Sequence, residues 1–300
     1  MPDTTYDAIV IGGSFAGLSA TMYLARSRRR VLLVDAGKSR NRFTDASHGF
    51  LGQDGRAPAE IRAIGMKELS AYPNVAFHTG EALDAREDGG AFVVVLGDGR
   101  SERARRLVLA TGMTDELPEV DGVKERWGRS VLHCPFCHGY EFGDRPLGVL
   151  ASTPLSAHQA DLIPDWGPTT YFTQGEFEPG AEELQRLAER CVTIERTPVV
   201  ELLGKAPALE AVRLADGRTV AVDAIFVAPK LRMTSPIAER LGCDFHDGPM
   251  GPFILVDGHK KTSVDGVYAA GDAAAAMHSA LLASAAGMMA GVAAYQSLIR

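Results

Sequence analysis

The chain contains 300 residues, which is enough for two domains of ordinary size. Hydrophobic residues make up 46% and charged residues 23%, as in globular proteins, and the net charge of −7 argues against a nucleic-acid-binding protein. The apolar residues 8–11 are too few for a secretory signal peptide. The alanine- and glycine-rich stretch 269–294 contains Asp272 and His278, so it predicts a buried helix rather than a membrane span. We expect a cytoplasmic protein that binds neither nucleic acid nor a membrane.

The first 35 residues predict a strand, a helix and a second strand. Residues 7–11 form a short apolar run, and residues 12–17 form a glycine-rich turn. Residues 18–26 are small and apolar throughout, which indicates a packed helix, and residues 31–34 form a second buried strand that ends at Asp35. This order is typical of the start of a dinucleotide-binding domain.

A weak internal repeat indicates two domains of this type. Residues 92–112 and 211–230 each predict a strand, an Asp-Gly turn, a second strand and a buried apolar strand. Because motifs of the first domain return after the second copy, the second domain is inserted in the first. We expect an α/β fold with two Rossmann-like domains, each a three-layer β/β/α arrangement. The outer domain comprises residues 1–113 and 231–300, and the inserted domain comprises residues 114–230.

The glycine-rich turn resembles a dinucleotide fingerprint. In Gly12-x-Ser14-x-x-Gly17, the first glycine permits the tight turn and the last lets helix and strand pack closely, while Ser14 adds a small side chain near the pyrophosphate. Asp35 stands where an acid accepts ribose hydroxyl hydrogen bonds. Taken alone, this pattern also fits a glycine-rich turn in another α/β fold.

Two further motifs favour FAD. Leu109-Ala-Thr-Gly112 ends one strand, and Gly266-Val-Tyr-Ala-Ala-Gly-Asp272 ends a later strand and opens a helix. An aspartate there can bind ribityl hydroxyl groups beside a helix N-terminus. With the first fingerprint, the three motifs resemble the flavoprotein disulfide reductases that contain two dinucleotide domains.

The segment His133-Cys134-Pro-Phe-Cys137-His138 carries the most specific chemistry. Its pattern formally fits c-type haem attachment, a zinc site of two cysteines and two histidines, a glutaredoxin-like motif, or a dithiol that exchanges electrons with the flavin. Haem attachment needs export, and adjacent ligands cannot easily close one zinc tetrahedron. We expect the dithiol and no metal site. Cys191 and Cys243 are expected to be small core residues.

Residues 111–141 and the order of the domains resemble the low-molecular-weight thioredoxin reductase family. The resemblance implies that Cys137 is the cysteine nearer the flavin, that Cys134 meets the substrate, and that the protein is a homodimer. Family members usually have an aspartate after the second cysteine, where this chain has His138. The string Cys-Pro-Phe-Cys-His-Gly-Tyr-Glu and residues 41–43 and 47–52 are similar to a subgroup that includes the dithiol oxidases of gliotoxin- and holomycin-type natural products.

The catalytic residues are therefore expected to be Cys134, Cys137 and His138. Only a thiolate is a nucleophile, and a nearby imidazole can accept the thiol proton; the alternative for His138 is a surface histidine without a role. His48, in a glycine-flanked loop, could reach the flavin. The residues expected to bind FAD are Gly12, Gly13, Ser14, Ala16, Gly17, Asp35, Ala36, Arg42, His48, Ala82, Ala110, Thr111, Gly112, Gly271, Asp272, Ser279 and Ala280.

The inserted domain lacks the features of an NAD(P)H site. Its first strand leads into residues 151–157, which contain no glycine, and Pro154 removes an N–H donor. No Arg or Lys occurs between Arg145 and Arg186 to pair with a 2′-phosphate. We expect an FAD-dependent thiol–disulfide oxidoreductase, without efficient NAD(P)H use, that acts on a small dithiol or disulfide or on a thioredoxin-like protein. The alternatives are an NADPH-dependent thioredoxin reductase, a ferredoxin-fed reductase, and a sensor that binds FAD structurally.

Overall fold

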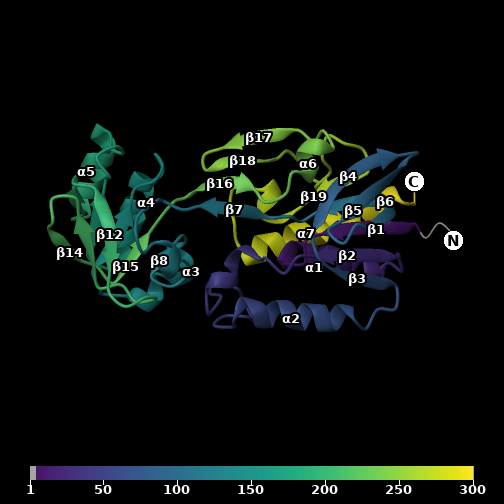
Figure 1. The fold of residues 1–300 in the computed structure, drawn as a ribbon, viewed down its shortest axis with the longest axis horizontal. Helices are drawn as coiled ribbons and strands as arrows, with labels where there is room; N and C mark the ends of the chain where they lie inside the picture. Colours follow the sequence, from purple (N-terminus) through teal and green to yellow (C-terminus); the bar gives the residue numbers. More distant parts are fainter. Residues whose placement is uncertain (1–4, 300) are drawn as a thin grey trace. The chain divides into compact units, whose positions relative to one another are not determined.

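The computed structural model describes residues 5–299 and divides into two compact units (Figure 1). Unit 1 comprises residues 5–42, 59–114 and 232–299, and unit 2 comprises residues 43–58 and 115–231. Strands β7 (Met113–Glu116) and β16 (Lys230–Met233) pair where the chain passes from one unit to the other. The division expected from the sequence placed residues 43–58 in the outer domain, whereas they group with unit 2.

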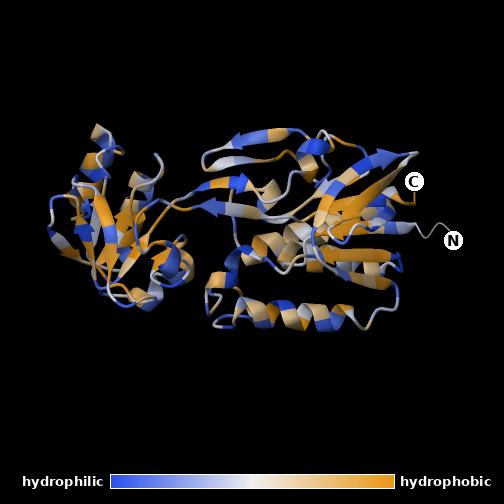
Figure 2. Ribbon diagram, in the orientation of Figure 1, coloured by the Kyte–Doolittle hydropathy of each residue, from blue (hydrophilic) through white to orange (hydrophobic). Residues whose placement is uncertain are grey.

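Unit 1 is built on a seven-stranded sheet in the order β3-β2-β1-β6-β5-β4, with β19 also pairing to β6. Strands β1, β2, β3, β6 and β19 are parallel, and β4 and β5 form an antiparallel meander with β6. The strands are β1 (Tyr6–Ile11), β2 (Val31–Asp35), β3 (Val75–Thr79), β4 (Ala82–Asp88), β5 (Ala91–Leu96), β6 (Ser101–Leu109) and β19 (Val267–Ala269). Figure 2 shows hydrophobic colouring along β1 and β2, as expected for strands covered on both faces.

Two helices pack closely against each other in unit 1. They are α1 (Phe15–Arg26) and α7 (Ala280–Ser297). A Cβ added at Gly287 would lie 2.7 Å from the carbonyl carbon of Ala16, and one at Gly291 would lie 2.6 Å from the carbonyl oxygen of Ala20. The two glycines therefore permit the close approach. The buried helix predicted over residues 269–294 is found only from Ala280 onward, and part of its surface is exposed, including Leu281 and Leu282. Within the part of the chain that is described, no helix combines the length and apolar character needed to cross a membrane.

The remaining elements of unit 1 are four helices and a hairpin. They are the helices η1 (Arg40–Phe43), α2 (Pro58–Leu69), α6 (Ile237–Arg240) and η5 (Gly271–Ala274), and the hairpin β17 (Phe245–Gly248) and β18 (Gly251–Ile254).

Unit 2 contains a parallel sheet in the order β11-β10-β9-β15-β8 and an antiparallel sheet in the order β12-β13-β14. The strands are β8 (Val131–Leu132), β9 (Leu147–Leu150), β10 (Thr169–Phe172), β11 (Thr193–Glu195), β12 (Val199–Leu203), β13 (Ala211–Leu214), β14 (Thr219–Ala221) and β15 (Ala224–Phe226). The helices are η2 (Lys124–Arg126), α3 (Pro135–His138), η3 (Tyr140–Phe142), α4 (Ser156–Leu162), η4 (Ile163–Asp165) and α5 (Ala181–Glu189).

The internal repeat is visible in both units and confirms the predicted α/β fold with two Rossmann-type units. In unit 2 the antiparallel strand β14 and the parallel strand β15 are separate elements. In unit 1 the long strand β6 makes both kinds of pairing. Residues 101–104 pair antiparallel with β5, and residues 107–109 pair parallel with β1 and β19. The Asp-Gly turn expected between the two strands of each meander lies at residues 98–99 and at residues 216–217.

Candidate functional site

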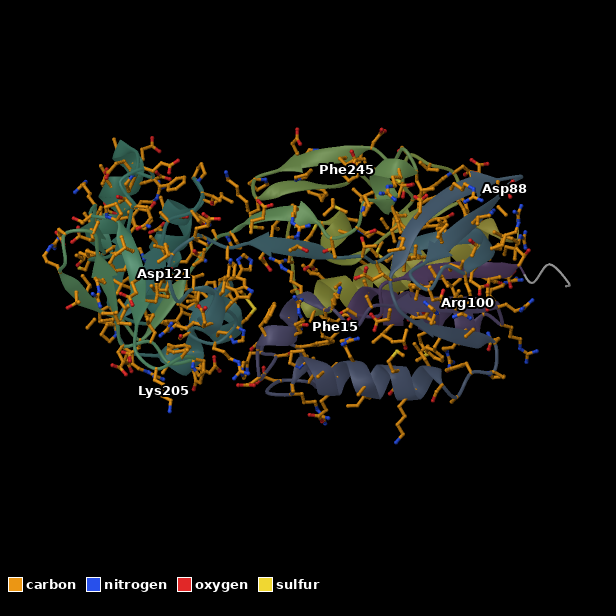
Figure 3. All side chains as sticks on the ribbon, in the orientation of Figure 1. Phe15, Asp88, Arg100, Asp121, Lys205 and Phe245 are labelled. Atoms are coloured by element: carbon orange, nitrogen blue, oxygen red, sulfur yellow. A yellow bond between two sulfur atoms is a disulfide. The ribbon has the colours of Figure 1, made fainter. Side chains whose placement is uncertain are left out.

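The turn between β1 and α1 requires glycine at both of its ends. Gly12 has a φ of +111°, and an added Cβ would collide with the carbonyl group of Ala110. A Cβ at Gly17 would collide with the carbonyl group of Gly12. Figure 3 shows Phe15 at the N-terminal end of α1, directly after this turn. The turn therefore holds the helix N-terminus, with its backbone N–H groups, close to the end of β1.

Asp35, at the end of β2, is tied to the same turn. Its carboxylate accepts hydrogen bonds from the backbone N–H groups of Gly13 at 3.2 Å and Gly37 at 3.1 Å. Arg62 of α2 donates to Asp35 Oδ2 at 2.6 Å and to the carbonyl of Gly13 at 3.1 Å. The contact of Arg62 with this turn was not predicted, because nothing in the local sequence pattern links a helix residue to a turn almost fifty positions earlier.

Residues 110–112 follow β6 and lie beside the turn. The N–H of Ala110 donates to the carbonyl of Ile11 at 2.8 Å. The hydroxyl of Thr111 is buried and has no hydrogen-bond partner among the described residues. A buried polar atom without a protein partner fits contact with a bound group.

The third motif brings Asp272 into unit 1 on η5. Arg40 donates from Nη1 to Asp272 Oδ2 at 3.0 Å, and the same atom lies 2.8 Å from His278 Nδ1. His278 Nε2 lies 2.9 Å from the carbonyl of Ala275, so Nε2 carries the proton and Nδ1 accepts from Arg40. Arg42, expected at the FAD site, donates from Nη1 to the carbonyl of Ser39. Arg40 was not among the expected residues.

The structure brings the three motifs of unit 1 together. Gly12 lies against Ala110, and a Cβ at Gly271 would lie 2.9 Å from the Cβ of Ala16.

Ser279 caps α7, since its hydroxyl accepts from the N–H of Leu282 at 3.0 Å, and Ala280 is the first residue of that helix. Of the other expected FAD residues, Ser14 is the N-cap of α1, Ala36 follows β2, Ala82 opens β4, and Gly112 has a φ of +69°.

Cys134 and Cys137 form a disulfide whose Cα atoms are 5.3 Å apart. Cys134 has extended backbone angles and is the N-cap of α3, so the spacing of three residues places both sulfurs at the start of one short helix. Gly139 follows the last residue of the helix, and an added Cβ there would lie 2.8 Å from the Trp166 ring. Gln159 of α4 donates to the carbonyl of His133 at 2.8 Å and thereby fixes the segment that leads into Cys134.

His138 and His48 lie close together in unit 2. Their ring centroids are 6.1 Å apart, with the rings perpendicular. His48 Nε2 is 3.4 Å from Glu141 Oε1, and Nδ1 is 3.6 Å from Asp54 Oδ1. Burial lowers the pKa of His138 below its ordinary value, the charge of His48 lowers it further, and Glu141 opposes this change. His48 was expected at the FAD site; the structure groups it with the disulfide segment.

The loop between β9 and α4 occupies the place of a nucleotide-binding turn in unit 2. The N–H groups of Ser152 and Thr153 donate to the hydroxyl oxygen of Ser156, at 3.1 and 3.3 Å. The hydroxyl groups of Ser152 and Thr153 donate to the carbonyl of Ala228, at 2.9 and 3.2 Å. The backbone N–H groups of Ser152 and Thr153 are therefore already satisfied within the protein.

The side chain that follows β10 is also held by hydrogen bonds within unit 2. Gln174 has a φ of +58°, and its side-chain amide bonds to both backbone groups of Val199, accepting from N–H at 2.8 Å and donating to the carbonyl at 3.2 Å. Because the side chain of Gln174 is bonded to β12, it is not available to form hydrogen bonds with a ribose.

Comparison with known proteins agrees with this geometry. Residues 6–153 and 176–291 match the family described as pyridine nucleotide-disulphide oxidoreductase. The chain belongs to this family. It is 30% identical over 279 residues to "Thioredoxin reductase tcpT" of Claviceps purpurea (strain 20.1), covering 89% of this chain and 86% of the relative.

Two solved structures are similar over nearly the whole chain. An oxidoreductase from Agrobacterium tumefaciens is 48% identical with a TM-score of 0.94 and 99% coverage of both chains. The structure titled HlmI is 37% identical with a TM-score of 0.93, covering 98% of this chain and 93% of that one. The predicted resemblance to thioredoxin reductase-like flavoproteins is thus confirmed. This member of the pyridine nucleotide-disulphide oxidoreductase family is an FAD-binding disulfide oxidoreductase.

Proposed function

We propose that the enzyme is a dithiol oxidase that passes electrons from a small dithiol to FAD through Cys134 and Cys137, without efficient use of NAD(P)H. The observation that carries the proposal is the internally bonded loop of unit 2, in which Ser156 occupies the backbone donors of Ser152 and Thr153. In a functional site those donors hold a pyrophosphate at a helix N-terminus.

Three further observations support a lost nucleotide site. Gln174, at the end of the next strand, is bonded to the backbone of Val199. No Arg or Lys occurs between Arg145 and Arg186. The family match is interrupted at residues 154–175, which is the segment that would contact the nucleotide.

The residues of unit 1 fit an FAD molecule. The turn at Gly12 and Gly17 has no room for a Cβ, the carboxylate of Asp35 adjoins it, and the buried hydroxyl of Thr111 has no protein partner in residues 5–299. We propose that these groups bind the cofactor together with Asp272, whose carboxylate Arg40 holds at 3.0 Å. When bound, FAD supplies a two-electron acceptor that oxygen can reoxidise.

The disulfide segment supplies the exchange chemistry. We propose that His138 accepts the proton of a substrate thiol, that the resulting thiolate attacks Cys134, and that Cys137 leaves as a thiolate. The lowered pKa of His138 keeps its imidazole neutral and able to accept that proton. We also propose a cytoplasmic homodimer, as the resemblance to low-molecular-weight thioredoxin reductases implies.

The alternative function is an NADPH-dependent thioredoxin reductase, and the name of the Claviceps relative favours it. An anaerobic titration of the yellow protein distinguishes the two functions. We expect dithiothreitol to bleach the flavin stoichiometrically, whereas micromolar NADPH or NADH leaves it oxidised. A Cys137→Ser variant serves as the control, since it retains FAD and blocks bleaching by the dithiol. Rapid stoichiometric bleaching of the wild-type flavin by NADPH would overturn the proposal.

A further inference from the structure

The loop of residues 43–58 carries a histidine into the disulfide segment of unit 2. His48 has a carboxylate beside each ring nitrogen: Glu141 at 3.4 Å from Nε2 and Asp54 at 3.6 Å from Nδ1. Only a protonated imidazole has an N–H donor on both nitrogens, so the ring can donate to both carboxylates at once only when it is protonated. The side chain is 22% exposed, which limits screening by water.

The same loop is anchored to unit 2 away from His48. Arg129 donates to the carbonyl of Phe43 at 2.8 Å and forms an ion pair with Asp45. Within the loop, Ser47 and Arg56 form a bridge, and Asp54 accepts from the N–H of Gly49 at 2.9 Å. These contacts tie the loop to unit 2 ahead of His48 and join the two sides of the loop around His48, so the position of His48 depends on the fold of unit 2.

His48 acts on His138 through charge. The centroid separation of 6.1 Å is longer than two directly hydrogen-bonded imidazole rings allow. A positive charge at this distance from a partly buried ring disfavours a second positive charge. The charged groups that face His138 are His48, from the loop, and Glu141, from η3, and they act on its pKa in opposite directions.

We propose that His48 is a positioning residue for the thiol–disulfide reaction: it keeps His138 neutral, and Glu141 and Asp54 hold His48 beside it. The assignment rests on the proposed function, because it concerns the proton that this reaction must move. It gives His48 a role at the dithiol, and the flavin contact expected from the sequence stays a separate prediction.

The exchange transfers two electrons and two protons from the substrate dithiol to the cysteine pair. A substrate thiol loses its proton to neutral His138, its sulfur attacks the sulfur of Cys134, and the bond between Cys134 and Cys137 breaks. Cys137 leaves as a thiolate and takes the proton from His138. The second substrate thiol then attacks the substrate sulfur of the mixed disulfide and its proton passes to Cys134. Substrate leaves as a disulfide, and two electrons and two protons have passed to the cysteine pair.

The first test is a histidine NMR titration of the holoenzyme, with His138→Gln used to assign the resonance. We expect His48→Gln to raise the pKa of His138, because it removes the group that opposes a positive charge there. Asp54→Asn should raise it too, because it removes a carboxylate that holds His48 and does not itself act on His138. His158→Gln, an exposed histidine on α4, is the matched control and should leave the titration of His138 unchanged. A pKa of His138 that stays in place in His48→Gln overturns the proposal.

The second test measures the rate at which dithiothreitol reduces the disulfide. At about pH 6, His48→Gln should react roughly 3- to 10-fold more slowly than wild type, and the difference should vanish at about pH 8.5, where His138 is neutral in both proteins. An equal slowing at every pH indicates a merely structural role and overturns the proposal. If His48→Gln does not fold, Asp54→Asn decides, and an unchanged pKa of His138 in that variant overturns the proposal. Neither measurement uses NAD(P)H, so bleaching by NADPH would defeat the proposed function and leave this result standing.

Discussion

Replacing Ser156 with alanine removes the acceptor on which the closed loop of unit 2 depends. The side chain of Ser156 is fully buried, and its oxygen accepts from the N–H groups of Ser152 and Thr153. Thr153 is itself buried, so water cannot easily replace the lost bond, whereas Ser152 is partly exposed. The Ser156→Ala variant should therefore keep the fold and lose stability in this loop.

The magnitude follows from the two hydrogen bonds. Each contributes about 0.5–1.5 kcal/mol net, and both are long enough to belong in the middle of that range or below. We expect a loss of roughly 1–2 kcal/mol, which corresponds to a 5- to 30-fold change in an equilibrium constant.

Amide hydrogen exchange measures this effect at the two residues concerned. The amide protons of Ser152 and Thr153 should exchange roughly 5- to 30-fold faster in Ser156→Ala than in wild type. Thr193→Ser, an exposed change on β11, is the control and should alter stability by less than about 0.5 kcal/mol. Unchanged exchange at both amides would refute the account of a loop closed by Ser156. The flavin should still not respond to NADPH, because the variant adds neither a glycine nor a basic residue.

Four other variants test residues of the two units. Cys134→Ser and Cys137→Ser should each abolish turnover with a dithiol while the protein stays yellow, and retained turnover in either would contradict the exchange role. His138→Ala should slow turnover roughly 10²- to 10⁴-fold, as expected for a positioned acid–base group, and full activity across the pH range would exclude that role. Gly17→Val should impair FAD retention, because its side chain meets the carbonyl of Gly12; the flavin-to-protein absorbance ratio measures this, and a wild-type ratio would show that the turn is not needed.

The features that the sequence predicted well depend on short-range spacing. The positions of Gly12 and Gly17 are set by one turn, and the three-residue spacing of Cys134 and Cys137 fits the first turn of α3. The repeat was also visible, because each copy has the same alternation and the same Asp-Gly turn. Local chain geometry alone decides these features.

The features that were missed depend on contacts between distant segments. Arg62 and Arg40 reach Asp35 and Asp272 from other elements, and no periodicity marks such pairs. The grouping of residues 43–58 with unit 2 arises from tertiary packing. One signal was present: Ser156, four residues after Ser152 at the start of a helix, has the spacing of a side chain that caps backbone N–H groups.

The grouping of residues 43–58 with unit 2 affects how chimeras of two related enzymes should be built. The chain crosses the boundary between the two compact units four times, after residues 42, 58, 114 and 231. A chimera that replaces only residues 115–231 would inherit the cysteine pair and His138 from one parent and His48 with Asp54 from the other. Both segments would have to be transplanted together for the donor's thiol reactivity to accompany its cysteines. In a lineage that acquires a new substrate, the short segment and the long one should likewise change together.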